Sequence, residues 1–327
     1  MTEKTIKNIG VFTSGGDSPG MNAAIRAVVR TALYYDIKVT GILRGYDGLI
    51  GGDFVPMERK SVANIIQRGG TVLKTARSDE FRTKEGRIKA FEQIKKEGID
   101  ALVAIGGDGT FTGANIFYKE FGVPVIGLPG TIDNDLLGTD FTIGYDTAIN
   151  TVIEAVDKIR DTAESHDRLF IVEVMGRDSG LIALRSGIGT GAEAILIPET
   201  KTDIKALLSR LEVSRKDKSS KIIIVAEGDD AGGAFEIAKR VKDKFPLIDT
   251  RVSVLGHIQR GGAPTCMDRV LASRLGVAAV ESLKDGKTCE MIGIVHGRIH
   301  FTPFSKAIKH NKVVNKELLK IVDILSL

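Results

Sequence analysis

Short apolar runs that end in or near glycine recur along the chain and alternate with amphipathic segments. Eight of these runs have the length and composition of strands: residues 9–12, 39–43, 101–107, 123–128, 169–176, 194–198, 221–228 and 252–257. Several are apolar at consecutive positions, which is typical of strands buried on both faces of a parallel sheet. Residues 23–33, 87–98 and 147–161 instead carry apolar side chains at positions i, i+3, i+4 and i+7, which predicts helices that pack on that sheet. The pattern therefore predicts the α/β class, doubly wound, with mainly parallel sheets.

The composition narrows the classes of function. The chain has 327 residues, 43% hydrophobic and 27% charged, which suits a globular protein of one or two domains. No apolar signal segment opens it and no apolar run reaches the about 18 residues that cross a bilayer, so we expect a cytoplasmic protein without a membrane partner. The net charge is +4, but the basic residues are dispersed and only 6% of residues are aromatic, which argues against nucleic acid. Cys266 and Cys289 have neither zinc-site spacing nor a disulfide framework, and we interpret both as unreactive.

Glycine-rich segments follow several predicted strands, where ligands of open α/β sheets collect. TSGGDSPGMN at residues 13–22 and GGDGT at residues 106–110 each lie between a strand and a helix start. Glycines let the backbone approach an anion, and the N–H groups of a helix start favour phosphate. Asp108 is the kind of carboxylate that holds Mg²⁺ beside a phosphate. Neither segment has the spacing of a P-loop or of a dinucleotide fingerprint, and a tight strand-to-helix turn is the alternative for the first.

A third segment, PGTIDND at residues 129–135, carries the carboxylates Asp133 and Asp135. One such carboxylate can take the proton of a hydroxyl while the other orients it or a metal shell, although a turn with Asx hydrogen bonds has the same composition. Cations and polar residues near later strand ends match phosphate and sugar hydroxyls. Each of them alone would more often be a surface residue. They are Arg168, Met175, Gly176, Arg177, Glu227, Arg251 and residues 257–262.

Taken together, these segments closely resemble the ATP-dependent 6-phosphofructokinase family. The matching motifs cover nearly the whole chain in family order: TSGGDSPGMNAAIR (13–26), RGGT (68–71), IGGDGT (105–110), PGTIDND (129–135), DKIRDTAESHDR (157–168), EVMGR (173–177), VAEG (225–228) and VLGHIQRGG (254–262). The resemblance implies a glycolytic kinase that transfers the γ-phosphoryl group of Mg-ATP to the 1-hydroxyl of fructose 6-phosphate. It also implies a cytoplasmic homotetramer with two α/β domains. Residues 1–143 with 258–308 would bind nucleotide, and residues 144–257 with 309–327 would bind sugar phosphate.

The resemblance assigns site residues motif by motif. Asp133 would be the general base, Arg77 and Arg177 would neutralise the transferring phosphoryl group, and Thr131 would act beside them. The expected ATP contacts are Gly16, Arg77, Ser78, Gly107, Asp108, Gly109 and Thr110, with Asp108 in the Mg²⁺ shell. The expected substrate contacts are Thr131, Ile132, Asp133, Met175, Gly176, Arg177, Glu227, His257, Ile258, Gln259 and Arg260, with Arg168 and Arg251 from a neighbouring subunit. Some relatives carry a larger residue at the place of Ser78, so we expect loose recognition of the base.

Basic residues outside this assignment match an effector site that the family builds between subunits for ADP or phosphoenolpyruvate. Its expected members are Arg26, Arg30, Arg59, Arg160, Gly191, Ala192, Glu193, Lys216, Lys218, Ser219 and Ser220. Such residues also occur as ordinary surface charge, which is the alternative.

Three other functions compete with this interpretation. Pyrophosphate-dependent relatives share the fold and the TIDND core, but the resemblance implies that they tend to carry Asp at the place of Gly109 and Lys at that of Gly130. Glycine at both positions would leave room for the α-phosphate of ATP. NAD kinases and diacylglycerol-type lipid kinases share only a GGDGT-like segment. A non-catalytic nucleotide sensor would keep the phosphate loops, but it would not need a base, a metal carboxylate and sugar-phosphate arginines together.

Overall fold

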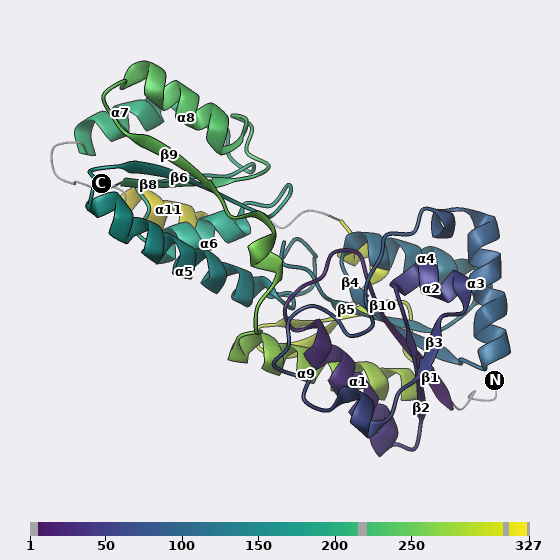
Figure 1. Cartoon of the computed structure of the whole chain (residues 1–327). Helices are drawn as coiled ribbons and strands as arrows, with labels where there is room; N and C mark the ends of the chain where they lie inside the picture. Colours follow the sequence, from purple (N-terminus) through teal and green to yellow (C-terminus); the bar gives the residue numbers. More distant parts are fainter. Residues whose placement is uncertain (1–5, 215–220, 310–313, 326–327) are drawn as a thin grey trace. The chain divides into compact units, whose positions relative to one another are not determined.

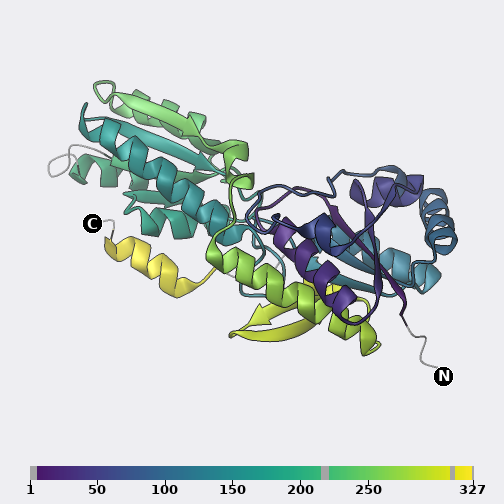
Figure 2. The ribbon, with the colours of Figure 1, turned by 60° about the horizontal axis from the view of Figure 1, so that its bottom comes forward.

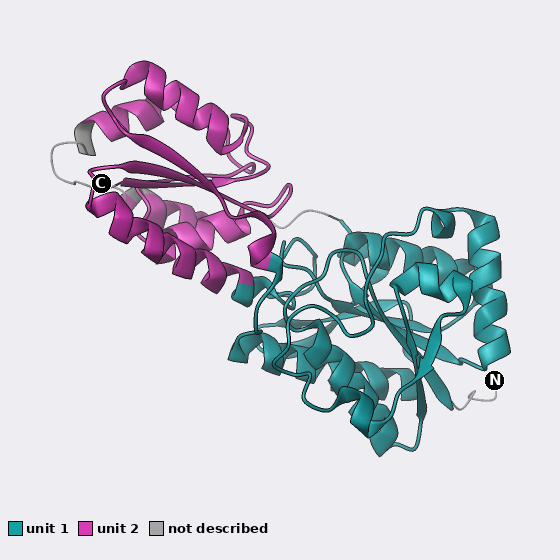
Figure 3. Cartoon of the chain, in the orientation of Figure 1, with its two compact units in different colours: residues 1–147, 260–312 teal, residues 148–259, 313–327 magenta. Residues whose placement is uncertain are grey.

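The structure is a computed structural model that describes residues 6–214, 221–309 and 314–325 (Figure 1). It forms two compact units, unit 1 with residues 1–147 and 260–312, and unit 2 with residues 148–259 and 313–327 (Figure 3). The expected domain limits, after residues 143, 257 and 308, lie two to four residues from these limits. Which ligand each unit binds stays a prediction.

Unit 1 is built on a seven-stranded sheet with the order β11-β10-β5-β4-β1-β2-β3. The pairs β10–β11 and β2–β3 are antiparallel and the other pairs are parallel. The strands are β1 (Asn8–Ser14), β2 (Lys38–Ile42), β3 (Phe54–Pro56), β4 (Ala101–Gly106), β5 (Val125–Pro129), β10 (Glu290–Val295) and β11 (Arg298–Pro303). The helices are α1 (Met21–Tyr34), α2 (Gly45–Gly51), η1 (Arg59–Val62), η2 (Glu80–Arg82), α3 (Lys84–Glu97), α4 (Asp108–Phe121), α9 (Cys266–Lys284) and α10 (Phe304–Ala307).

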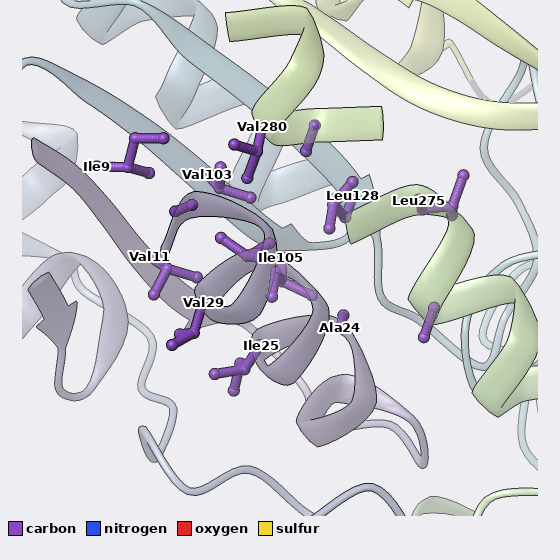
Figure 4. Close-up of a cluster of buried hydrophobic side chains, with 14 of the residues drawn as sticks. Ile9, Val11, Ala24, Ile25, Val29, Val103, Ile105, Leu128, Leu275 and Val280 are labelled. Atoms are coloured by element: carbon purple, nitrogen blue, oxygen red, sulfur yellow. The ribbon is translucent and has the colours of Figure 1, made fainter. Parts of the chain in front are cut away.

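Helices cover both faces of this sheet. Helices α1 and α9 pack against each other and on one face, as Figure 2 shows. Their side chains Ile25 and Leu275 meet Val11 and Val103 of the strands in a continuous apolar core (Figure 4). Helices α2, α3, α4 and α10 cover the other face through a second core that is rich in phenylalanine. The strands that carry the glycine-rich loops are therefore buried on both faces, as their continuous apolar runs predict.

Unit 2 has a four-stranded parallel sheet with the order β7-β8-β6-β9. Helices α7 and α8 share one core with its strands, and α6 contacts β7 and β8. The strands are β6 (Leu169–Val174), β7 (Ala194–Leu196), β8 (Lys221–Ala226) and β9 (Thr250–Val254). The helices are α5 (Tyr145–Glu164), which starts in unit 1, α6 (Leu181–Gly189), α7 (Ile204–Ser214), α8 (Gly233–Lys244), η3 (Gly256–Arg260), which ends in unit 1, and α11 (Lys316–Leu325).

The fold class and all eight predicted strands are confirmed, and the three predicted helices correspond to α1, α3 and α5, although α3 ends one residue before the predicted limit at residue 98. The hairpin of β10 and β11 was not predicted. Its two central turn residues, His296 and Gly297, have φ of 49° and 78°, which is the conformation of a two-residue hairpin turn. Among the described residues, no helix is long and apolar enough to cross a membrane.

Candidate active site

Three loops leave the sheet of unit 1 at the same level. Ser14 at the end of β1 pairs with Gly106 of β4, and Gly106 pairs in turn with Pro129 of β5. The strand order reverses between β1 and β4, because β2 lies beyond β1 and β5 lies beyond β4. Ligands of open α/β sheets bind at such a reversal. The segments 13–22, 106–110 and 129–135 thus meet at one edge of the sheet.

The second of these loops opens helix α4. No side chain caps the helix start at Gly107, so N–H groups of the first turn can receive an anion. Asp108 is the first residue of the helix and is half-buried. Apart from the flanking residues and the backbone of α4 itself, no described atom lies within 4 Å of the place that a Cβ on Gly109 would take, so a side chain here would enter open space. The buried Thr110 donates its hydroxyl to the Ser14 carbonyl at 3.0 Å, and its side chain therefore ties the second loop to the first.

The third loop places a carboxylate inside the protein. Asp133 is 4% exposed, and its backbone N–H donates to the hydroxyl of Thr131 at 3.2 Å. The whole of Ile132 is buried, so in this structure the residue packs inside the loop. A Cβ on Gly130 would lie 3.0 Å from Ile105 and 3.1 Å from Met21. An added Cβ would thus point toward packed side chains of the sheet and of α1. Room for the α-phosphate of ATP at Gly130 stays a prediction.

An arginine lies against the first loop. Arg260 donates from Nη1 to the Asp17 carbonyl at 3.2 Å, and a Cβ on Gly16 would lie 2.6 Å from the same nitrogen. The absence of a side chain at Gly16 is what lets the guanidinium approach so closely. The resemblance assigns Arg260 to the sugar phosphate, and the structure brings it to the loop that is expected to bind ATP.

Residues 68–75, which begin with the RGGT motif and are called the strap below, hold the first loop from another side. Thr75 donates its hydroxyl to the Gly15 carbonyl at 2.8 Å. Asn22 of α1 donates to two strap carbonyls at 3.1 Å and accepts from the N–H of Val72 at 2.8 Å. The sequence did not identify Thr75 and Asn22 as residues of the site, although the RGGT motif at residues 68–71 pointed to this segment.

The segment with Arg77 and Ser78 is anchored by two aromatic rings. The Ser78 hydroxyl accepts from the N–H of Phe81 at 3.3 Å, and the Phe81 ring stacks on Tyr46 with centroids 3.9 Å apart. The Tyr46 hydroxyl donates to the Thr110 carbonyl at 2.6 Å, and burial raises the pKa of this phenol. Arg77 is exposed. The expected nucleotide residues 77–78 and 107–110 are thus linked through Tyr46, which the sequence did not single out.

In unit 2 the segment 175–177 forms a turn beside Glu227. The Glu227 carboxylate accepts from the N–H of Gly176 at 3.2 Å and of Arg177 at 2.8 Å. Both turn residues have positive φ, 145° at Gly176 and 52° at Arg177. The carboxylate thus holds a strained turn, and it brings the Arg177 backbone and Glu227 together at the strand ends.

The expected substrate residues 257–259 behave differently from one another. His257 and Ile258 are exposed at the end of β9, with Ile258 57% exposed. Gln259 is fully buried, accepts from the Met175 N–H at 3.3 Å and donates to the Gly256 carbonyl at 3.1 Å. The expectation of a substrate contact by the Gln259 side chain is therefore corrected: this amide supports the turn from behind.

Arg168 and Arg251 lie at the opposite edge of the unit 2 sheet. Arg168 precedes β6 and Arg251 is the second residue of β9, and both form ion pairs with Asp249, at 2.7 and 3.0 Å. The hydrogen bond from Arg168, and to a lesser degree the interaction with Arg251, holds the pKa of Asp249 below its ordinary value. Met175, Glu227 and His257 instead follow the ends of the parallel strands, and a strand of this length spans about 20 Å. One chain therefore does not bring the two groups to a single phosphate.

The expected effector residues fall in both units. In unit 1, Arg26 and Arg30 lie on α1, which contacts η1, where Arg59 is the first residue. Burial, and then repulsion by Arg30, lowers the pKa of Arg26. An anion beside these two guanidinium groups would relieve their repulsion.

In unit 2, Arg160 donates to the carbonyl of Thr190, directly before Gly191. Glu193 is 3% exposed and accepts from the Ile222 N–H at 2.6 Å, and Ala192 is buried. Glu193 thus supports the pairing of β7 and β8 whatever else it binds. The remaining expected members, Lys216, Lys218, Ser219 and Ser220, lie outside the described residues.

Comparison with known proteins decides the family. The phosphofructokinase family model matches residues 8–283. The chain is 57% identical over 324 residues, 99% of both chains, to ATP-dependent 6-phosphofructokinase 2 of Bacteroides thetaiotaomicron. The chain belongs to the phosphofructokinase family. It is also 56% identical to ATP-dependent 6-phosphofructokinase 1 of Thermus thermophilus, over 98% of this chain and 100% of that protein.

Solved structures agree with the phosphofructokinase fold. The phosphofructokinase of Saccharomyces cerevisiae superposes with a TM-score of 0.89 at 38% identity, over 98% of this chain and 48% of the yeast chain, so this chain spans about half its length. A pyrophosphate-dependent phosphofructokinase from Marinobacter aquaeolei superposes with a TM-score of 0.85 at 22% identity. This second likeness shows the shared fold alone.

Proposed function

We propose that this phosphofructokinase-family chain transfers the γ-phosphoryl group of ATP to the 1-hydroxyl of fructose 6-phosphate. The products are fructose 1,6-bisphosphate and ADP, and the reaction is a step of glycolysis in the cytoplasm. The observation that carries the proposal is the meeting of three loops at the sheet reversal, with a helix start for phosphate, Asp108 at that helix start and the buried Asp133. The relatives named above, 56–57% identical over nearly the whole chain, support it.

Unit 1 supplies the nucleotide site. Gly16 and residues 107–110 offer backbone N–H groups to the phosphates, and Arg77 and Ser78 lie on the segment that Tyr46 anchors beside them. A carboxylate at the first turn of α4, next to open space at Gly109, fits a magnesium ion, which Asp108 would hold together with phosphate oxygens. When bound, the ion neutralises charge on the phosphates.

Asp133 acts on the acceptor. It takes the proton from the 1-hydroxyl while the hydroxyl oxygen bonds to the γ-phosphorus, and the bond from that phosphorus to the β,γ-bridging oxygen breaks, so ADP leaves with the electron pair. Thr131 orients the Asp133 loop through its hydroxyl. Arg77 and Arg177 neutralise the equatorial oxygens of the transferring group.

Residues of unit 2 hold the sugar phosphate. The turn of Met175, Gly176 and Arg177 and the carboxylate of Glu227 match the sugar hydroxyls, while His257 matches the 6-phosphate. The family resemblance also assigns Thr131 and Ile132 to the sugar and Arg260 to the 6-phosphate. The position of Arg168 and Arg251 at the far edge of the same sheet supports their action on the site of a second copy. The family resemblance further supports a homotetramer, in which each site borrows these two arginines from a neighbouring subunit.

ATP is the proposed donor rather than pyrophosphate. Gly109 supports this choice through the open space beside it. Gly130 supports it through the family resemblance, because pyrophosphate-dependent relatives tend to carry Lys at this position. The second candidate function is thus phosphoryl transfer from pyrophosphate, and no observation in this chain favours it.

An anionic effector is part of the proposal. As the resemblance implies, Arg26, Arg30, Arg59, Arg160 and Glu193 would bind ADP or phosphoenolpyruvate at a site between subunits. Arg26 and Arg30 lie on α1, and α1 contacts η1, which begins at Arg59, so these three residues come from neighbouring elements of unit 1.

A coupled assay tests the proposed function directly. Purified protein is supplied with fructose 6-phosphate, Mg²⁺ and either ATP or pyrophosphate, and the formation of fructose 1,6-bisphosphate is followed. We expect turnover with ATP and little with pyrophosphate. Faster turnover with pyrophosphate than with ATP would show that pyrophosphate is the donor. Nucleotide binding without turnover would indicate a non-catalytic sensor.

A further inference from the structure

A buried carboxylate on α9 holds the segment between the third loop and helix α5. Asp268 is 1% exposed, and its Oδ1 accepts from the N–H of Gly144 at 2.8 Å. Its Oδ2 accepts from both the N–H and the hydroxyl of Thr147, at 2.8 and 2.5 Å. Burial raises the pKa of Asp268, and these three donors oppose that effect. Both carboxylate oxygens of Asp268 thus accept hydrogen bonds from the two ends of the segment 144–147.

The first turns of α5 and α9 cap each other. Thr265, which precedes α9, donates its hydroxyl to Asp146 at 2.7 Å, and its N–H donates to the Thr147 hydroxyl at 3.0 Å. The same Thr265 hydroxyl accepts from the Asp268 N–H at 3.2 Å. The network therefore satisfies orphan N–H groups of two helix starts at once, which makes the position of residues 144–147 strongly determined.

Residues 142 and 143, which directly precede the segment 144–147, are hydrogen-bonded to the loop that carries Asp133. The Ile143 N–H donates to the Pro129 carbonyl at 2.8 Å. Thr142 donates its hydroxyl to the Thr131 carbonyl at 2.6 Å, and its N–H donates to the Asn134 side chain at 2.9 Å. The chain of contacts from Asp268 to the residues that flank Asp133 is thus continuous within unit 1.

The same segment also packs under the first glycine-rich loop. Gly144 has a φ of 101°, and a Cβ at this position would lie 2.6 Å from the Ser18 side chain. A Cβ on Gly20 would lie 2.7 Å from Ile143 and 3.6 Å from the Asp268 side chain. Any shift of residues 143–144 would therefore be transmitted to both loops.

We propose that Asp268 is a positioning residue for phosphoryl transfer, which fixes residues 142–147 so that the Asp133 loop and the first glycine-rich loop keep their mutual geometry. This inference rests on the proposed function. A displacement of a reacting group by about 1 Å can cost about 100-fold in rate without a comparable loss of binding. Loss of this carboxylate should consequently act on kcat much more than on KM.

The test compares variants of the full-length enzyme. Asp268→Asn keeps the size of the side chain but replaces one acceptor oxygen by an N–H₂ group. This group cannot accept hydrogen bonds from the donors of residues 144 and 147. We expect kcat to fall at least about 10-fold while KM for ATP and for fructose 6-phosphate stays within about threefold. Thr147→Val, which replaces the hydroxyl by a methyl group, should show a smaller loss of kcat, again with little change in KM. Thr147→Ser keeps the hydroxyl and should restore kcat.

Asp229→Asn is the matched control. Asp229 is 6% exposed and accepts from the Thr202 hydroxyl at 2.8 Å and the Ala231 N–H at 3.0 Å, in unit 2. Its variant should lose thermal stability but keep kcat. Wild-type kcat in both Asp268→Asn and Thr147→Val would overturn the inference, as would an equal loss of kcat in Asp229→Asn. If Asp268→Asn does not fold, Thr147→Val against Thr147→Ser decides. An inactive wild type would instead overturn the proposed function.

Discussion

Asp133 has little freedom to relocate, because it is 4% exposed and its own N–H is bonded to Thr131. We predict that Asp133→Ser lowers kcat by at least about 100-fold, since a positioned proton acceptor contributes on that scale, with smaller changes in KM. Asp133→Asn preserves the shape and removes the basicity, so it should be similarly impaired. Steady-state kinetics with ATP measures both. A near-normal kcat in the Asn variant would show that the proton goes elsewhere.

Gly109 offers a substitution that tests the nucleotide site without disturbing the fold. Because no described atom outside the flanking residues and the α4 backbone lies within 4 Å of the added Cβ, we predict that Gly109→Asp keeps the Tm of the wild type. It should lower kcat/KM for ATP by about 10-fold or more, through repulsion between carboxylate and phosphate. Gly109→Ala is the control and should have a small effect. An unchanged kcat/KM in the Asp variant would mean that the phosphates bind away from this helix start.

At the scale of residues, the sequence identified the segments but not the direction of each side chain. Ile132 and Gln259 lie inside functional motifs, yet both side chains are fully buried. Gln259 bonds to Met175, which is 84 residues away in the chain, and such a partner is not visible in local spacing. Tyr46 and Asp268 were missed for the same reason: their roles depend on elements that meet only after folding.

At the scale of elements, one ion pair joins α3 to α4. Arg87 is 8% exposed and contacts Glu120 at 2.6 and 2.9 Å, while its Nη1 donates to the Phe81 and Arg82 carbonyls. The hydrogen bond from Arg87 lowers the pKa of Glu120 below its ordinary value of 4.5. A lowered folded pKa contributes stability that is present above the ordinary pKa and is lost as the pH falls through the folded pKa.

We therefore predict that Glu120→Gln lowers the free energy of unfolding by about 1–2 kcal/mol at neutral pH, and by progressively less below about pH 4.5. Urea denaturation at several pH values measures this. Glu154→Gln removes an exposed i,i+4 pair with Lys158 that solvent screens, so it should change the free energy of unfolding far less than Glu120→Gln. A penalty at Glu120 that does not depend on pH would contradict the electrostatic explanation.

The periodicity predicted elements best where a strand is buried on both faces and feeds a crossover helix. β1, β4 and β8 are continuous apolar runs and were predicted. β3 has only three residues, and β10 leads into a hairpin rather than a helix, so neither fits that pattern. His296 and Gly297 at the hairpin turn were the available signal for β10 and β11.

At the scale of the whole molecule, the two crossings between units that fall within the described residues lie inside α5 and inside η3, which are regular elements rather than linkers. This explains why composition marked the boundaries so weakly. The division into two α/β units and the residues that belong to each rested on the family resemblance. The roles of the expected effector residues rest on it still, since no local pattern distinguishes them from surface charge.

The far-edge position of Arg168 and Arg251 implies that activity can be rebuilt from two defective proteins. Asp133→Ser should inactivate a chain's own site, whereas Arg251→Ala should cripple the site of its neighbour. When the two variants are unfolded together and reassembled, a pair that contains one of each has one site with neither defect. In a 1:1 mixture with random pairing, about a quarter of all sites have neither defect. The mixture should therefore show about a quarter of the wild-type activity, although each variant alone is nearly inactive. Reassembled mixtures without regained activity would show that each chain serves only itself.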